Sequence, residues 1–494
     1  MTHRARLVVD PVAVIAPVNP MLFGSFVEHM GRGVYSGIYE PGHPRADSDG
    51  FRSDVLDLVR ELGVTAVRYP GGNFVSGYRW EDGVGPTENR PMRRDQAWKS
   101  LEPNTFGLGE FIRWAGEAGV EPIIALNLGT RGTREAVELL EYANDPGVSP
   151  LGLQHGREQS YGILTWCLGN ELDGPWQMGH KTADEYGLLA LATARSMREF
   201  DPGLRLILCG SSGVSMPTFG SWDETVLEHA FGEVDLISAH AYFDPEAGST
   251  DEFMASAVEM NRQIRSVAAI ADAVARKRGS SKRIDIAFDE WNVWYMGRHN
   301  AAAAADEWRR APRLCEDDYT VTDAVVVGSL LMTLLRNSDR VGIACQAQLV
   351  NTIAPIRAEP GGECWRQTIF HPFSLMSAHA RGHVIEVDVA GPEVDGGRHG
   401  RVPAVEAVAT HDAAAGVTVI FAINRAHHRV AAGLGPGMEV LELLVLADED
   451  PGAANTKSKP ERVHPRPGDW SHRNGGLEVL LPPMSWSMLR LAAD

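Results

Sequence analysis

Two glutamates stand where acid–base chemistry on a bound ligand would need them. Glu171 ends the segment TWCLGNE and Glu290 lies in IAFDEWN, so each directly follows a run of apolar residues. Two carboxyl groups facing one sugar are the usual machinery of glycoside hydrolysis: one protonates the departing oxygen and the other attacks or activates water. Burial and a neighbouring charge can separate their two pKa values, as the two roles require. In the alternative interpretation, Glu171 caps a helix and Glu290 pairs with an arginine.

Polar side chains also follow the other apolar runs of the first 350 residues. Any one of them could be a helix cap or a loop residue. A polar group after almost every run indicates instead that the ends of the runs meet at one functional face. These residues are Glu28, His29, Arg68, Asn73, Asn127, Asn170, Ser211, Ser212, His240, Tyr242 and Gln348.

Aromatic residues near the same ends favour a carbohydrate ligand. The flat rings of Trp and Tyr pack on the apolar C–H faces of sugars, while Asn, Gln and His bind the hydroxyl groups. Trp98 is equally consistent with a purely structural wall of the fold. The candidates are Trp98, Trp176, Trp291, Trp294 and Tyr242.

The sequence predicts neither a metal site nor a cofactor site. It has no HExxH motif and no Cys/His cluster at zinc spacing. The segments GTRGT and CGSSG form neither a phosphate loop nor a G-x-S-x-G elbow. His29 and His240 could ligate a metal in principle, but beside Tyr242 we expect a hydrogen-bonding role for His240. The five cysteines are an odd number without a CxxC pair, so free thiols are expected.

The elements that must position these residues alternate in type. Eight apolar runs, each typical of a strand buried on both faces, are separated for the most part by helical patterns. Eight such strands over about 330 residues predict an α/β fold of the (β/α)₈ TIM-barrel type. An open doubly wound sheet is the alternative, although no GxGxxG follows the first run. The strands are expected at 23–29, 64–73, 121–129, 164–171, 205–212, 234–242, 284–292 and 340–350, and helices at 51–63, 107–119, 133–144, 182–200, 252–279 and 321–338.

The pattern changes near residue 375, where short alternating runs punctuated by turn residues replace the helical periodicity. This alternation predicts a C-terminal β-sandwich. We therefore expect a catalytic barrel at 19–375 and a sandwich domain at 376–494, which the N-terminal strand at 1–18 would join. The basic, polar stretch at 453–470 is interpreted as a solvated loop.

The amino-acid composition limits the classes of ligand and partner that the protein is expected to bind. The 494 residues carry 46 basic and 65 acidic side chains, a net charge of −19. Nucleic acid is excluded as the main ligand because binding phosphates requires a basic face. The longest apolar stretch, at 324–335, is shorter than the roughly 18 residues of a membrane span. The N-terminus lacks the apolar core of a signal peptide. We expect a cytoplasmic protein with no membrane partner.

Several segments together resemble glycoside hydrolase family 51, the intracellular α-L-arabinofuranosidases. They are FGSFVEHMGRGVYSGIYEPGHP, VRYPGGNFVSGYRWEDGVGP, NLGTRG, WCLGNELDGPWQMGHKTADEYG, FDEWNVWY and AQLVNTIAPI, and the similarity covers nearly the whole chain. The resemblance implies a (β/α)₈ barrel with a C-terminal β-sandwich, as the patterns also predict. It further implies a homo-oligomer, commonly a hexamer, and an arabinose-containing oligosaccharide as substrate.

The resemblance also implies a role for each matching residue. Glu171 would be the general acid/base and Glu290 the nucleophile of a retaining double displacement. Arg68 and His240 would support these two carboxyl groups. Glu28, Asn73, Asn170, Tyr242 and Gln348 would bind the arabinofuranose.

Three functions remain open from the sequence. The first is an exo-acting α-L-arabinofuranosidase that trims arabino- and arabinoxylo-oligosaccharides. The second is a barrel glycosidase for a pyranoside such as a β-xyloside. The third is an inactive sugar-binding protein, against which the presence of both Glu171 and Glu290 argues.

Overall fold

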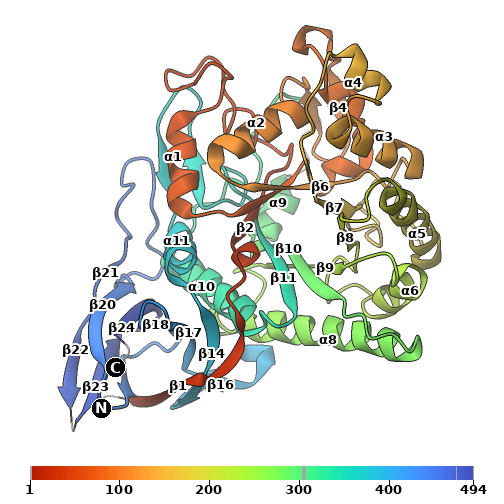
Figure 1. The fold of residues 1–494 in the computed structure, drawn as a ribbon. Coiled ribbons are helices and arrows are strands. Elements are labelled where there is room, and N and C mark those ends of the chain that lie inside the picture. Colours follow the sequence, from red (N-terminus) through yellow and green to blue (C-terminus); the bar gives the residue numbers. More distant parts are fainter. Residues whose placement is uncertain (1–2, 303–307, 474, 493–494) are drawn as a thin grey trace.

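Eight parallel strands close into a barrel in the computed structural model, which describes residues 3–302, 308–473 and 475–492. Residues 1–2 and 493–494, which the prediction assigned to the sandwich domain and its N-terminal strand, lie outside the described residues. Each predicted run contributes one barrel strand, so the predicted barrel is confirmed (Figure 1). The strands are β2 (Gly24–Phe26), β3 (Ala66–Tyr69), β6 (Glu121–Ala125), β7 (Thr165–Leu168), β8 (Arg205–Leu208), β9 (Leu236–Phe243), β10 (Asp285–Val293) and β11 (Val341–Ala347).

Helices surround the barrel, and their apolar faces form one core with the strands. They are α1 (Ser53–Leu62), α2 (Leu108–Ala118), α3 (Thr133–Asn144), α5 (Ala183–Phe200), α6 (Ser221–Ala230), α7 (Thr250–Met254), α8 (Ser256–Lys277) and α10 (Val321–Arg336). The sequence analysis did not predict α6, although its buried residues Trp222, Val226 and Ala230 recur at the four-residue spacing of a helix. The single helix expected at 252–279 is instead two, because the chain breaks at Ala255.

Local signals explain where the long helices begin. Thr182 accepts a hydrogen bond from the Glu185 amide, and the Glu185 carboxylate accepts one from the Thr182 amide, so the two residues cap the start of α5. Thr320 and Asp323 form the same reciprocal arrangement at α10. Such capping boxes satisfy amides that the first helical turn leaves unpaired.

A second sheet of ten strands contains both ends of the described chain (Figure 1). Its order is β21-β20-β24-β18-β17-β14-β1-β19-β23-β22, and side chains from both halves share one apolar core. Strand β1 (His3–Pro17) pairs with β14 and β19 in this sheet. The others are β14 (His383–Ala390), β17 (Val405–Asp412), β18 (Val417–Asn424), β19 (Val430–Leu434), β20 (Glu439–Leu446), β21 (Arg466–Pro467), β22 (Trp470–Arg473), β23 (Gly476–Leu481) and β24 (Ser485–Ala492).

This mostly-strand C-terminal part confirms the predicted fold class. The domain limits at residues 18, 375 and 376 stay predictions. Helix α11 (Phe370–His379) lies across the expected boundary.

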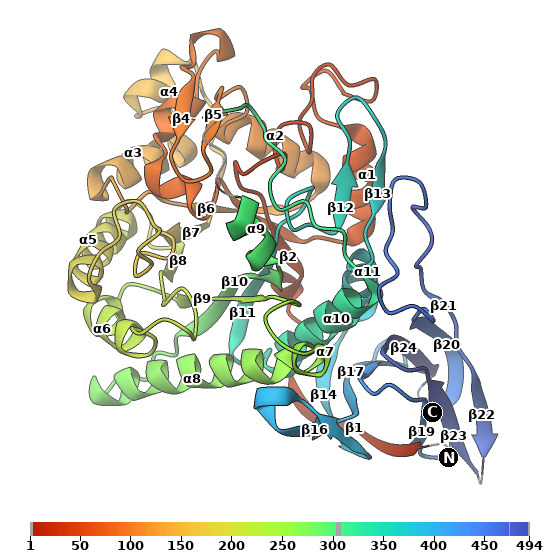
Figure 2. The ribbon, with the colours of Figure 1, turned by 180° about the vertical axis from the view of Figure 1, so that it is seen from behind.

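Helix α10 connects the barrel to the ten-stranded sheet. It packs against β14, β17, β18 and β24 on one side and against α8 and β10 on the other (Figure 2). Gly328 of α10 lies against the fully buried ring of Trp486, and a Cβ at this glycine would be 2.3 Å from Trp486 Cδ1. The barrel core therefore continues into the ten-stranded sheet.

The interpretation of residues 453–470 as a solvated loop is wrong at three buried positions. The segment leaves the sheet and lies against the barrel, where Ala453, Asn455 and Val463 are buried. The Val321 amide, at the start of α10, donates to the Ala453 carbonyl. Asn455 exchanges two hydrogen bonds with the backbone of Val463. Sequence patterning missed this because these contacts use the backbone and isolated side chains rather than an apolar stripe.

The fold also contains three short strand pairs and two short helices. They are the strand pairs β4 (Arg93–Asp95) with β5 (Ser100–Glu102), β12 (Ile356–Ala358) with β13 (Cys364–Arg366) and β15 (Glu393–Asp395) with β16 (Arg401–Pro403), and the helices α4 (Pro150–Gln154) and α9 (Met296–Ala302). All five cysteines are free, as expected. Within the described residues, none of the helices has the length and apolarity needed to cross a membrane.

Candidate active site

The predicted catalytic residues meet at the carboxyl ends of the barrel strands. Glu171 follows β7, and Glu290 lies on β10 beside His240 of β9. The register between β9 and β10 shifts between Ala287 and Glu290, as at a β-bulge. Because of this shift, two neighbours in sequence, Asp289 and Glu290, both reach the His240 imidazole.

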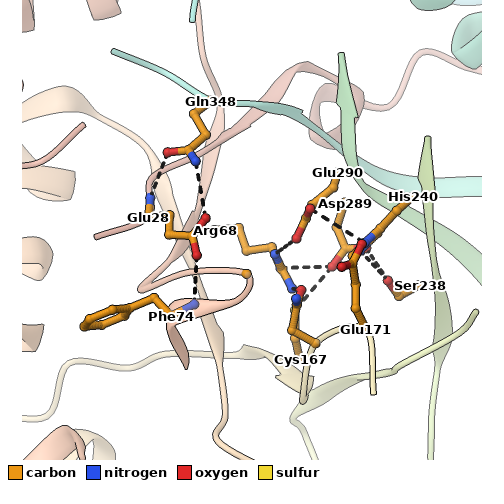
Figure 3. Close-up of polar contacts among 12 residues, drawn as sticks. Glu28, Arg68, Phe74, Cys167, Glu171, Ser238, His240, Asp289, Glu290 and Gln348 are labelled. Carbon is orange, nitrogen blue, oxygen red and sulfur yellow. Dashed lines mark hydrogen bonds and ion pairs between the residues drawn. The ribbon is translucent and has the colours of Figure 1, made fainter. Parts of the chain in front are cut away.

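Both oxygens of the Glu290 carboxylate are held. Arg68 Nη1 donates to Oε1 at 2.7 Å (Figure 3). The Tyr242 hydroxyl donates to Oε2 at 2.8 Å. The side chain is buried. Two donors on a buried carboxylate fix its direction, as a nucleophile requires.

Glu171 is held by two different donors and has strained backbone. His240 Nδ1 lies 2.9 Å from its Oε1, and Trp176 Nε1 donates to Oε2 at 2.8 Å. Its φ of +44° lies in the left-handed region, which non-glycine residues enter mainly at functional sites. Burial raises the pKa of Glu171, and the charge of Glu290 raises it further, while the His240 hydrogen bond opposes this. Burial and the charge of Glu290 thus favour the protonated form of Glu171.

The two carboxyl groups lie close to each other and to the imidazole. One oxygen from Glu171, one from Glu290 and a ring nitrogen of His240 all lie within 4.8 Å of one another. Across the part of the chain that the structure describes, this is the one group of three such side chains with metal-binding proximity. His240 Nδ1 is 2.9 Å from Glu171 and 3.7 Å from Glu290, so an imidazole proton can serve both carboxylates. The expectation of a metal-free site stays a prediction.

Arg68 connects Glu290 to the other side of the site. Its Nη2 donates to Asn170 Oδ1 at 2.7 Å, and its Nε is 3.0 Å from Asp289 Oδ2. Asn170 Nδ2 is buried and has no hydrogen-bond partner among the residues that the structure describes. A buried unpaired donor is costly unless a ligand satisfies it. Asn170 is therefore positioned to bind a hydroxyl group of a ligand.

Glu28 and Gln348 form a second polar wall. Glu28 Oε1 accepts from the Phe74 amide at 2.9 Å and from Trp98 Nε1 at 2.8 Å, and Gln348 Nε2 lies 3.3 Å from Oε2. Burial outweighs these hydrogen bonds and raises the pKa of Glu28 to about 8. At neutral pH this carboxyl group is largely protonated and can donate a hydrogen bond to a sugar.

Three of the four predicted tryptophans lie at or near the site, and the fourth does not. Trp98 is half-buried and lies at the site through its bond to Glu28. Trp294 packs edge-on against the Tyr242 ring, 5.1 Å between centroids. Trp176 is about half exposed beside Glu171. Trp291 is fully buried in the barrel core, so its interpretation as a sugar-facing ring is wrong.

Not every polar residue at a strand end joins the site. Asn127 binds the loop that ends at Thr130. Ser211 and Ser212 bind Asp173. His29 is buried between Glu102 and Tyr69, 2.8 Å from each. These residues stabilise the loops around the site rather than line it.

Asn73 is partly buried and makes no side-chain hydrogen bond to the described residues. It directly follows Gly72. A Cβ on Gly72 would lie 3.1 Å from Glu290 Oε1 and 3.5 Å from Asn170 Nδ2. The backbone before Asn73 therefore runs along the edge of the site.

Sequence analysis missed two contributors, Asp289 and Ser238, which lie beneath His240. It named Trp176 only as a ring surface, whereas the indole also donates to Glu171. The acidic pair Asp289–Glu290 was visible in the sequence, but alternation along a strand places neighbours on opposite faces. The bulge that overturns this alternation has no local sequence signal.

Comparisons with known proteins agree with this geometry. Two family models match the chain: "Alpha-L-arabinofuranosidase 1 domain" over residues 58–263 and "Alpha-L-arabinofuranosidase C-terminal domain" over residues 289–485. The chain is 54% identical to an intracellular exo-α-(1→5)-L-arabinofuranosidase of Streptomyces lividans, over 99% of this chain and 75% of the relative.

Two proteins of Bifidobacterium longum are also similar. An exo-α-(1→6)-L-arabinofuranosidase is 49% identical, over 99% of this chain and 97% of the relative. The solved structure of a family 51 α-L-arabinofuranosidase superposes with a TM-score of 0.94 at 44% identity, covering 99% of this chain and 100% of that one. Identity at this level over both whole chains shows common membership. The chain belongs to glycoside hydrolase family 51, the α-L-arabinofuranosidases.

Proposed function

We propose that this protein is a retaining, exo-acting α-L-arabinofuranosidase that releases terminal arabinofuranosyl residues from arabino- and arabinoxylo-oligosaccharides. The observation that carries the proposal is the pairing of Glu171 with Glu290 at the barrel rim, with an oxygen of each within 4.8 Å. Retaining enzymes keep the two carboxyl groups about 5–5.5 Å apart, whereas inverting enzymes need roughly 6.5–9.5 Å to accommodate a water. The short separation supports direct attack by one carboxylate.

In the first step, Glu290 attacks the anomeric carbon while Glu171 protonates the departing oxygen, and a covalent arabinosyl-enzyme forms. Arg68 and Tyr242 orient the attacking carboxylate. Forming the ester removes the charge of Glu290, which is one cause of the raised pKa of Glu171. Glu171 then ionises more readily and takes a proton from the water that hydrolyses the ester.

Arabinofuranose would be bound by the polar groups around this pair. Asn170 offers an unpaired donor, and Glu28 with Gln348 forms the opposite wall. Asn73 and Tyr242 complete the set that we assign to the sugar, with Arg68 and His240 behind the two carboxyl groups. The rings of Trp98 and Trp294 would contact the apolar face of the substrate.

The finer substrate assignment rests on the relatives. Their names specify α-(1→5) and α-(1→6) linkages, so we propose short arabino-oligosaccharides with these linkages as substrates. One relative is named intracellular, which supports a cytoplasmic location. We propose a homo-oligomer, a hexamer as in the family, on the resemblance alone.

A panel of p-nitrophenyl glycosides tests the activity. We expect the α-L-arabinofuranoside to be hydrolysed at least 100-fold faster than the β-D-xyloside, because we assign the polar groups around Glu171 and Glu290 to a furanose ring. Proton NMR of the first minutes of reaction should show the α anomer of the released arabinose. Faster cleavage of the xyloside would contradict the assigned substrate. Binding of the glycosides without hydrolysis would identify a sugar-binding protein instead of an enzyme. Initial release of the β anomer would contradict the retaining mechanism.

A further inference from the structure

A buried chain of hydrogen bonds runs from Asp289 to the carboxyl group assigned as the general acid/base. Ser238 Oγ donates to Asp289 Oδ1 at 2.6 Å, and the same oxygen lies 3.0 Å from His240 Nε2. On the other side of the ring, His240 Nδ1 lies 2.9 Å from Glu171 Oε1 (Figure 3). Ser238 and His240 are two residues apart on β9, so both point to the same face of the strand.

The hydroxyl group makes this chain directional. A serine has one proton to donate, and the short contact commits that proton to Asp289. Ser238 Oγ can then only accept from His240, which must carry its proton on Nε2. His240 Nδ1 consequently faces Glu171 with a lone pair when the ring is neutral and with a proton when it is charged.

One proton is therefore shared between Glu171 and His240. Either a protonated Glu171 donates to a neutral ring, or a charged ring donates to a Glu171 carboxylate. The negative charge of Asp289, with Oδ1 3.4 Å from Nε2, stabilises the second form and keeps the proton in the pair. Burial alone would raise the pKa of Asp289, but the charge of Arg68 and the hydrogen bonds from His240 and Ser238 lower it to about 2.

We propose that Ser238 and Asp289 are positioning residues that fix the tautomer of His240 and hold the catalytic proton on the Glu171–His240 pair. The proposal rests on the proposed function, because it concerns the proton that leaves with the glycosidic oxygen and is replaced from water. Neither residue touches the substrate.

The groups around His240 come from four strands, β3, β7, β9 and β10. In addition, α8 supplies the Gln263 amide, which donates to the His240 carbonyl. The titratable and charged groups around the ring are Glu171 after β7, Asp289 and Glu290 on β10 and, beyond these carboxylates, Arg68 on β3, Tyr242 on β9 and Cys167 on β7. Three carboxyl groups around one permanent cation, Arg68, make retention of a further proton favourable.

The test is the pH dependence of kcat/KM on an α-(1→5)-arabino-oligosaccharide, whose leaving group needs protonation. In the wild type, the alkaline limb reports loss of the proton from the Glu171–His240 pair. Asp289→Asn removes the charge that holds this proton, and Ser238→Ala frees a neutral ring to place its proton on Nδ1, which stabilises ionised Glu171. Both variants should shift the alkaline limb to lower pH by about one unit or more.

Cys167→Ala is the matched control. Cys167 Sγ contacts Asp289 Oδ2 at 3.6 Å and is equally buried, but no hydrogen bond joins it to His240. Its alkaline limb should stay at the wild-type pH. If Asp289→Asn does not fold, as judged by circular dichroism and melting temperature, Ser238→Ala decides the outcome, because it removes only one buried hydroxyl.

The two levels of the proposal fail differently. A wild-type protein that does not hydrolyse arabinofuranosides overturns the proposed function. A wild-type enzyme that is active, with variants whose rates fall evenly at every pH and whose limbs do not move, overturns the positioning role alone. A limb that moves as far in Cys167→Ala as in Asp289→Asn would also overturn it, because burial damage would then explain the shift.

Discussion

At the scale of single residues, the environments of Glu171 and Glu290 differ in the way their proposed roles require. Glu290 has both oxygens bound by donors, one of them the permanent cation Arg68. Glu171 instead bonds to a titratable imidazole and an indole. The same residue type thus has a permanently charged donor in one place and a titratable hydrogen-bond partner in the other.

This difference predicts unequal effects of the two alanine variants. Glu290→Ala removes the covalent step and should be nearly inactive on every substrate. Glu171→Ala should lose about 10²–10⁴-fold on natural oligosaccharides, which need a protonated leaving group. With p-nitrophenyl arabinofuranoside the first step should survive and the base-assisted second step should slow, so a burst of nitrophenol is expected.

Azide distinguishes this interpretation from general damage to the site. It attacks the covalent intermediate without a base, so it should restore turnover of Glu171→Ala and give an α-arabinosyl azide, identified by NMR. Glu290→Ala under the same conditions is the control and should yield no azide of the retained configuration. Equal losses of Glu171→Ala on both classes of substrate, with no effect of azide, would show that Glu171 is not the acid/base.

At the scale of elements, α10 is shaped by its partner rather than by helix propensity. Most of its side chains are apolar, and every residue from Val321 to Leu335 except Thr322 is buried. Gly328 has no side chain because the Trp486 ring fills that space. Alanine normally stabilises a helix interior by about 1 kcal/mol relative to glycine.

At position 328 alanine should instead lower the stability of the protein relative to glycine. Gly328→Ala places a Cβ 2.3 Å from Trp486 Cδ1, so the ring or the helix must move. Overpacking of this kind costs about 1–3 kcal/mol, and urea unfolding should show a lower free energy of unfolding. Gly116→Ala in α2, where a Cβ would meet nothing within 4 Å, is the matched control and should be neutral or stabilising. A Gly328→Ala protein as stable as the control would mean that α10 and β24 pack less tightly than described.

At the scale of the whole molecule, one buried carboxylate connects the barrel to the ten-stranded sheet. Glu406 of β17 is paired with Arg336 at the end of α10 and with Arg425, which follows β18. Burial alone would raise the pKa of Glu406, but the charges of Arg336 and Arg425 lower it to about 2. A pKa below its usual value of 4.5 means that the folded state favours the ionised form.

The consequence for stability follows from proton linkage. The contribution of Glu406 is fully present above pH 4.5 and is lost as the pH falls through 2. Glu406→Gln leaves buried Arg425 without its carboxylate and should lower the free energy of unfolding by roughly 3–5 kcal/mol at pH 7. The difference from wild type should shrink steadily between pH 4.5 and 2.

Chemical denaturation across this pH range measures the difference. Glu138→Gln breaks an exposed pair with Arg134 on one helix and should cost no more than about 0.5 kcal/mol at any pH. A Glu406→Gln deficit that does not change with pH would contradict the linkage.

Light scattering on the wild type tests the proposed hexamer, which would have six times the 53.8 kDa mass of one chain.

Much of the fold was readable from the sequence because its signals are local. The eight runs of buried residues became the eight barrel strands, and the Thr182 cap began α5, since both depend on residues close together in the chain. Glu171 and Glu290 were identified for the same reason, because each follows its strand directly. Helix α6 was overlooked although its buried residues have helical spacing, whereas the break at Ala255 gave no local signal.

What the tertiary structure alone decided depends on contacts between distant segments. The bulge that brings Asp289 under His240, the burial of Trp291 in the core and the contact of residues 453–463 with the barrel all involve partners far apart in sequence. The sequence by itself determined which residue types stand at the strand ends. Their protonation depends on burial and on neighbouring charges from other strands, so only the closed barrel decides which carboxyl group holds a proton.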